Sequence, residues 1–223
     1  MSVNAAPPAP HPLPPAAVIE RYQYALEMLL PPPYQVFEFT VDQVGWNDIA
    51  QTHRIYRGRG FQRDELIADG GHAVKPPVVR IRRAARDRYA VSAVAPMPAG
   101  YTFMFAGVVR RGERLAYLFQ TRPAGPAQAF VVRSVVIDGV SYLPSKITFA
   151  THAAKAAGSG TMLFAKSGSY WVATRVSVTS TVSGHQASES IVFSGYRFPK
   201  SLPTATFKTS HALSAASAAA LSE

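Results

Sequence analysis

Apolar and polar positions alternate through the C-terminal half of the chain. Residues 131–207 form successive segments rich in Val, Ile, Thr, Phe and Tyr, which are typical of strands. The breaks fall at Asp138-Gly139, at 166–169 and at 183–185, where the residues accept the positive φ or local hydrogen bonding of tight turns. These segments are therefore predicted to be antiparallel strands joined by hairpins.

Segment 170–182 shows the alternation most clearly. Three valines share one parity and three polar residues share the other, which predicts one buried face and one wet face. They are Val172, Val176 and Val178 on one side, and Arg175, Ser177 and Thr179 on the other. The pattern favours a half-buried, strongly curved sheet.

Residues 16–30 have the period of a helix. Apolar residues recur at intervals of three and four, at Val18, Tyr22, Ala25, Leu26 and Leu29. Pro31-Pro32-Pro33 prevents the helix from continuing. The stripe predicts a helix that covers one end of the sheet. A free helix on a membrane surface is the less favoured alternative, because the polar face carries both Glu and Arg.

Apolar and polar residues alternate again at 34–44. Segments 51–58 and 61–68 follow, and the three are predicted to form a three-strand meander. The Gly- and Pro-rich segment 70–77 is predicted to be a long loop, and 90–100 a short helix or flap.

The next hairpin, 101–123, is apolar at both parities. Tyr101, Phe103 and Phe105 share one parity, while Met104 and Val108 make the other apolar, so this strand is predicted to be buried on both faces.

These segments predict a mainly β fold: a single curved antiparallel sheet, or half-barrel, of about ten to eleven strands with an N-terminal helix and short lid helices. One domain is expected at 16–207, because 223 residues suit a single all-β core. The Ala- and Pro-rich residues 1–15 are predicted to form a disordered tether and 208–223 a flexible tail. No apolar run approaches the roughly 20 residues that span a bilayer.

The chain is strongly basic, with a net charge of +10 that attracts polyanions. Many arginines fall between Arg54 and Arg88. They fit a patch that faces an anionic membrane surface, and equally the solvated faces of edge strands, where cations discourage aggregation. No recognition helix is evident, so nucleic acid is not expected as a partner. The N-terminus lacks the basic and apolar regions of a secretory signal, so either the protein stays inside the cell or the chain begins after a cleavage site.

Catalytic and metal-binding patterns are missing. There is no cysteine, and the six histidines show no i, i+2 or i, i+4 pair that would present two metal ligands. Ser167 and Ser194 lack the G-x-S-x-G elbow of hydrolases. We therefore expect no catalytic residue, no metal and no cofactor, and a protein that is not an enzyme. A hydrolase built from distant residues stays open as a third class, because triads assemble in space.

Aromatic residues are the main candidates for a binding site. Their number suits a curved sheet whose concave face stays open for an apolar ligand, with the helix and segment 90–100 as lids. The alternative for each is an ordinary place in the core. The candidate ligand-binding residues are Phe37, Phe39, Tyr101, Phe103, Phe105, Tyr117, Phe119 and Trp171.

The order of these segments resembles the bacterial lipoprotein-carrier superfamily, the LolA/LolB-like half-barrels. The resemblance covers roughly residues 16–207. It is carried by the helix at 16–30, the basic hairpin ending IYRGRGFQRDE, the hairpin YTFMFAGVVRRGERLAYLFQTRP, the strand YWVATRVSV, and the closing SIVFSGYRFPKSLPTATF. The most family-like features are VVID followed by Leu-Pro, and the terminal Tyr-x-Phe-Pro, Leu-Pro and Phe207.

That resemblance implies a periplasmic or cell-envelope half-barrel that accepts a lipid or a lipoprotein acyl chain. The expected function is therefore non-enzymatic binding or transport of a hydrophobic ligand by a monomer. The alternative is a structural or regulatory envelope module of the same fold, whose cavity is filled by its own side chains.

Overall fold

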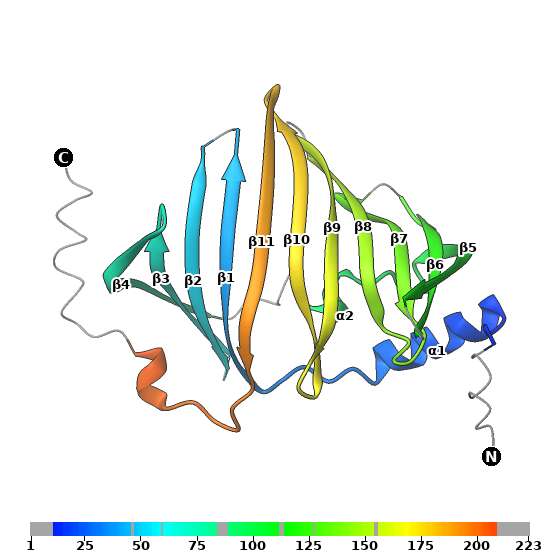
Figure 1. Cartoon of the computed structure of the whole chain (residues 1–223), viewed down its shortest axis with the longest axis horizontal. Coiled ribbons are helices and arrows are strands. Elements are labelled where there is room, and N and C mark those ends of the chain that lie inside the picture. The colour runs from blue at the N-terminus through cyan, green and yellow to red at the C-terminus, as the bar shows by residue number, and fades with distance from the viewer. Residues whose placement is uncertain are drawn as a thin grey trace, which may run out of the picture.

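The protein forms one open, curved sheet (Figure 1). The computed structural model describes residues 11–45, 47–58, 60–83, 89–111, 114–126, 128–153 and 156–208. The elements in chain order are α1 (Pro15–Glu27), β1 (Tyr34–Val44), β2 (Ile49–Gly58), β3 (Phe61–Asp69), β4 (His72–Arg83), α2 (Val91–Val94), β5 (Tyr101–Arg111), β6 (Arg114–Pro123), β7 (Phe130–Asp138), β8 (Pro144–Ala153), β9 (Ala156–Ser167), β10 (Tyr170–Val182), β11 (His185–Arg197) and the 3₁₀ helix η1 (Thr204–Phe207). In the view of Figure 1, α1 lies below the right-hand strands of the sheet and α2 lies behind β9 and β10.

The eleven strands lie in the order β4-β3-β2-β1-β11-β10-β9-β8-β7-β6-β5, and every pair is antiparallel. All neighbours are consecutive in the chain except β1 and β11. The sheet is not closed, so β4 and β5 are its two edges among the described residues. The predicted fold class, a single curved antiparallel half-barrel with an N-terminal helix, is confirmed.

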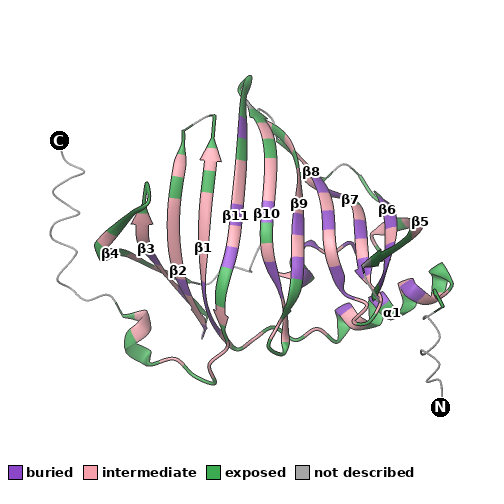
Figure 2. Ribbon diagram, viewed as in Figure 1, coloured by how far each residue is buried: buried purple, intermediate pink, exposed green. Residues whose placement is uncertain are grey.

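Both helices pack on the same face of the sheet, which we call the inner face. Val18, Tyr22 and Leu26 of α1 and Val91 and Val94 of α2 belong to one buried cluster with the strand residues of that face. The strands contribute Phe37, Ile55, Tyr117, Phe119, Val132, Val135, Ile137, Ile147, Phe149, Met162, Phe164, Ala173, Val176, Ile191 and Phe193. Figure 2 shows buried segments along strands β6 to β11 and near the lower ends of β1 and β2.

The prediction of a loop at 70–77 is wrong, because β4 begins at His72 and includes both prolines. A proline donates no ladder hydrogen bond, so it is tolerated only where a strand has a free side. Edge strand β4 provides that place, and Pro76 and Pro77 lie in residues 74–77, which have no partner on β3 between the pairs Ala68–Ala73 and Leu66–Val78.

The predicted face of Val172 is also wrong. Pairing of β10 with β9 shifts by one residue between Ala173 and Arg175, which makes Thr174 the extra residue of a bulge. Ala173 therefore shares the inner face with Val176, while Val172 points outward. A single bulge reverses the side-chain parity of the strand that precedes it.

The prediction that the 101–109 strand is buried on both faces is wrong as well. β5 is an edge strand, and Met104, Phe105, Val108 and Val109 are 50%, 45%, 38% and 38% exposed. Helices form in both segments that were predicted to act as lids. α1 spans Pro15–Glu27, where a helix was expected at 16–30, and α2 spans Val91–Val94 within 90–100.

No helix in the described part of the chain is long and apolar enough to cross a bilayer. The predicted tether and tail fall largely at 1–10 and 209–223, outside the described residues. The domain limits of 16 and 207 stay predictions.

Candidate functional site

All eight candidate ligand-binding residues lie on the inner face, but their exposure differs. Phe37, Tyr117 and Phe119 are only 5%, 2% and 2% exposed, so they are enclosed by the protein itself. Phe39, Tyr101, Phe103 and Trp171 are half-buried and pack against the core. Phe105 is the exposed member, with its ring centroid 5.5 Å from that of Phe119.

One aromatic group lies below α1 at the β5 edge. The Tyr22 ring meets the edge of Phe103 at 5.8 Å, and Phe103 in turn contacts Phe119 at 6.1 Å. Edge-to-face rings at these separations attract one another beyond the area they bury. This end of the inner face is therefore filled by a helix residue and two strand residues.

A second aromatic group lies where β1 pairs with β11. Phe193 contacts Phe37 at 6.1 Å, Phe39 at 6.0 Å and Tyr89 at 5.4 Å. Phe39 also stacks on the imidazole of His53 at 4.8 Å. Phe193 was among the aromatics of the sequence but not among the eight candidates, because the chain pattern does not show that β11 returns beside β1.

The two lids are tied to each other and to the sheet. The Tyr22 hydroxyl donates to the carbonyl oxygen of Pro96, just after α2, at 2.9 Å. The backbone N–H of Leu13, before α1, donates to the Tyr117 hydroxyl at 2.9 Å. Burial raises the pKa of the Tyr22 phenol well above its usual range, since the charged form would lose its hydration.

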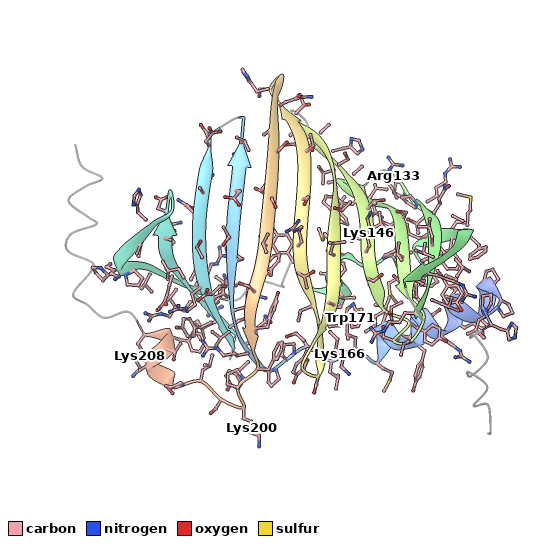
Figure 3. The ribbon with its side chains drawn as sticks, viewed as in Figure 1. Arg133, Lys146, Lys166, Trp171, Lys200 and Lys208 are labelled. Atoms are coloured by element: carbon pink, nitrogen blue, oxygen red, sulfur yellow. The ribbon has the colours of Figure 1, made fainter. Side chains whose placement is uncertain are left out.

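An apolar pocket of about 200 Å³ opens where the lids meet the sheet. Its wall comes from the leucines and prolines that follow α1, from the start of α2, and from Tyr170 and Trp171 of β10. The Trp171 indole N–H donates to the carbonyl oxygen of Pro144 at 2.8 Å, which fixes the ring. Figure 3 places Trp171 and Lys166, its partner across β9 and β10, at the end of the sheet near α1.

Polar side chains of the described residues also line this pocket, among them Gln35, Arg57 and Ser92. The Arg57 guanidinium lies over the Phe37 ring at 5.8 Å and donates to Oε1 of Gln62 at 2.8 and 3.2 Å. A guanidinium at the wall of an apolar pocket suits a ligand with an acidic end. Of this pocket, only Trp171 was among the candidates; the Pro and Leu residues after α1 carry no sequence pattern that marks them.

A larger pocket, about 690 Å³, lies on the opposite, outer face. It is an open surface that includes a row of hydroxyl side chains, because Ser190, Ser177, Thr161 and Thr148 are neighbours across four adjacent strands. Thr148 and Ser134 share a hydrogen bond of 2.6 Å. Because this surface is open to solvent, it would leave much of a bound ligand exposed, so its size does not make it the candidate site.

The inner face also holds one His–Asp pair. His53 Nδ1 lies 2.7 Å from Asp64 Oδ1, in a small pocket of about 80 Å³. The other described residues that line it are Gln51, Leu66, Val78 and Arg80, so no serine, threonine or lysine nucleophile adjoins the imidazole there. No group of three or more His, Asp or Glu in the described residues has the geometry to hold a metal ion.

The basic region divides into paired and exposed arginines. Arg54 lies 2.8 Å from Glu38 and Arg63 lies 2.7 Å from Glu65, so both have a carboxylate partner. The hydrogen bond to Glu38 raises the pKa of Arg54. Arg80, Arg82 and Arg83 are exposed along edge strand β4. The exposed cations therefore gather at one edge of the sheet.

No protein-family model matches the chain, and no curated protein is significantly similar to it. Solved structures of similar shape exist. A putative outer membrane lipoprotein-sorting protein domain from Vibrio parahaemolyticus has a TM-score of 0.46 at 13% identity, over 85% of this chain and 95% of that chain. A DUF1329 family protein from Desulfovibrio piger has a TM-score of 0.45 at 10% identity, over 86% and 96%.

A LolA superfamily protein from Nitrosomonas europaea has a TM-score of 0.38 at 11% identity, over 87% of this chain and 97% of that chain. Two of the three descriptions thus name the lipoprotein-sorting or LolA group that the sequence resembles. Similarity at these TM-scores says nothing about the ligand or location of this chain.

Proposed function

We propose that this protein binds an apolar ligand, a lipid or the acyl chain of a lipoprotein, on its inner face in the bacterial cell envelope, without catalysing a reaction. The observation that carries this proposal is the apolar pocket beside Trp171, whose ring also packs against the buried cluster of the inner face. Arg57, the one cationic residue among the described residues of this wall, suits a ligand whose polar end is acidic.

The pocket requires the lids to move before it admits a whole acyl chain. Sites for small ligands usually measure roughly 300–1,000 Å³, whereas this one is about 200 Å³. α2 is a single turn of four residues, so its displacement disrupts few backbone hydrogen bonds. We therefore expect binding to shift α2 and the chain after α1 away from Trp171.

Tryptophan fluorescence tests the proposal directly. The chain has two tryptophans, so Trp46→Phe leaves Trp171 as the only reporter. A brominated fatty acid should quench Trp171 to saturation, because heavy-atom quenching needs near contact. The same acid without bromine is the matched control, since it binds without quenching by contact. Quenching that never saturates, or that is absent, contradicts binding in this pocket.

A second candidate function is favoured by the three enclosed residues, Phe37, Tyr117 and Phe119. Their contacts are already made by the protein, as in a structural or regulatory envelope module with a self-filled cavity. This candidate predicts no saturable quenching and no lipid in native mass spectra of the protein purified from cells. Co-purified lipid supports the first candidate instead.

A further inference from the structure

The two edges of the sheet differ in how they are protected. Edge strands expose unpaired N–H and C=O groups, and natural sheets shield them with prolines, cations or bulges. β4 has that protection along its length, from Lys75, Pro76, Pro77, Arg80, Arg82 and Arg83. Segment 101–109 of β5 has no charged residue and no proline, and its one device of this kind is a bulge at Ala106. β5 lies at the opposite end of the sheet from β4 (Figure 1).

β5 exposes apolar side chains on both faces. Ala106 is the extra residue of a bulge in its pairing with β6, between Phe105 and Gly107. The bulge places Phe105 and Val108 together on the inner face, and Met104 and Val109 together on the outer face. All four are 38% to 50% exposed. An edge that is apolar on both faces is expected to be covered by another strand.

We propose that β5 pairs antiparallel with β5 of a second copy of this chain, so that two half-barrels share one continuous sheet. Two-fold pairing centred between Ala106 and Gly107 places Phe105 opposite Val108 of the second copy, and Met104 opposite Val109. Each pair lies on one face, because both strands carry the same bulge. A bulge disrupts pairing with a regular strand. Here the two paired strands carry the same bulge at the same place, so their registers still match.

Charge is compatible with this register. Arg110 falls opposite Phe103 of the second copy, so the arginines of the two copies lie at opposite ends of the interface. The net charge of +10 still makes the two copies repel each other over longer distances. Association is therefore expected to strengthen as salt screens that repulsion. One strand edge is a small interface, which predicts a dimer that forms only at raised concentration. This proposal replaces the expectation of a monomer.

Sedimentation velocity of the full chain tests the pairing. The sedimentation coefficient should rise with protein concentration, and rise further between about 20 mM and 300 mM salt. The double change Met104→Lys with Val109→Lys should weaken dimerisation by about tenfold or more, because cations are the natural protection of an edge. Val78→Lys on β4 is the matched control, because this side chain is 50% exposed at the other edge of the sheet. It should leave dimerisation unchanged. Circular dichroism confirms that each variant folds.

Disulfide capture tests the register. The chain has no cysteine, so introduced thiols are the only ones. Met104→Cys mixed with Val109→Cys should cross-link about tenfold more than either variant alone, because only this pair comes within the roughly 4.4–6.8 Å between Cα atoms that a disulfide needs. Identical positions in the two copies are five residues apart in this register, or about 17 Å.

Three results would overturn the proposal. The first is a parent chain that stays monomeric at every concentration and salt. The second is a dimer that Val78→Lys breaks and the β5 variant does not. The third is equal cross-linking in the mixed and single samples. Association only with another protein, weakened by salt, would assign the β5 edge to a foreign acidic strand instead.

Discussion

Tyr22 of α1 donates a hydrogen bond to the carbonyl oxygen of Pro96, 2.9 Å away, and its side chain is completely buried. Seventy-four residues separate the two, so this bond joins lids that the chain does not connect locally. Because it lies at the junction of α1 and the segment after α2, we expect it to hold the closed state of the lids.

Tyr22→Phe should therefore destabilise the protein by about 1–2 kcal/mol, since it removes the bond and leaves a buried carbonyl oxygen unpaired. The variant should also bind a fluorescent fatty acid faster, because the lids separate more readily. Tyr24→Phe on the same helix is the control, as Tyr24 is 65% exposed. Urea denaturation and stopped-flow fluorescence measure the two effects. Equal stability of the two variants would refute the role of this bond.

Stability should also fall at alkaline pH because of Tyr22. Its pKa is raised in the folded state, so its contribution is complete below the unfolded value of about 10 and is lost as the pH rises above it. The slope should approach about 1.4 kcal/mol per pH unit for this one group. Denaturation at a series of pH values measures it, and Tyr22→Phe should flatten the curve. If stability falls equally at alkaline pH in the parent protein and in Tyr22→Phe, groups other than Tyr22 cause the loss.

Phe119 and Phe105 form a matched pair, with rings 5.5 Å apart but exposures of 2% and 45%. Phe119→Ala should cost about 3–5 kcal/mol, because transfer and cavity terms add in a closed core. Phe105→Ala should cost about 1 kcal/mol or less, because that ring already meets solvent. Chemical denaturation of both variants at a concentration where the chain is monomeric provides the comparison. Similar costs would mean that the β5 edge is buried in solution.

Gly160 of β9 lies where any side chain would collide with rigid neighbours. A Cβ there would overlap the carbonyl oxygen of Ser177 and lie 2.7 Å from Cζ of Phe149. Gly160→Ala is therefore expected to destabilise the protein by about 1–3 kcal/mol through overpacking. Gly125→Ala, which meets no atom within 4 Å, is the control. Thermal unfolding of the two variants measures the difference in stability. If Gly160→Ala is as stable as the parent protein, β9 and β10 can separate locally.

The exposed arginines of β4 should attract anionic vesicles at low salt. Replacing Arg80, Arg82 and Arg83 with Gln should weaken that binding by up to about 100-fold, at roughly 1 kcal/mol for each cation near the surface. Arg54→Gln is the control, because Arg54 is already paired with Glu38. Vesicle co-sedimentation at low and physiological salt measures the effect, with duplex DNA as competitor. Tighter binding to DNA than to vesicles would contradict a membrane role for β4.

Most strands could be predicted from the sequence, because alternation and turn residues are local. Faces were harder to predict, since one bulge at Thr174 places Val172 on the outer face, where it is still only 8% exposed, without any visible break in the pattern. The sequence of β5 does not indicate that this strand lies at an edge of the sheet. An apolar strand has the same pattern whether a neighbouring strand of the same chain or another molecule covers it. β4 shows the reverse, because its prolines indicate a loop until the free side of an edge strand is known.

The same limit applies to the candidate site. The aromatic residues were identified by type, and all eight share the inner face. Exposure separates Phe105 from Phe119, and it depends on where the chain places α1 and the sheet edge. The pocket at Trp171 arises from segments far apart in the chain, the residues after α1 and the start of α2. No local pattern indicates that these two segments meet.

The pairing of β1 with β11 sets the order in which the molecule can be completed. Every other strand pair joins neighbours in the chain, so both the β1–β4 meander and the β5–β11 meander can form from local hairpins. The junction between them cannot form until β11, the last of the described strands, has left the ribosome or a translocation channel. Until then β1 offers an uncovered edge with Phe37 and Phe39 beside it. Chaperone dependence during biogenesis should therefore centre on this one seam.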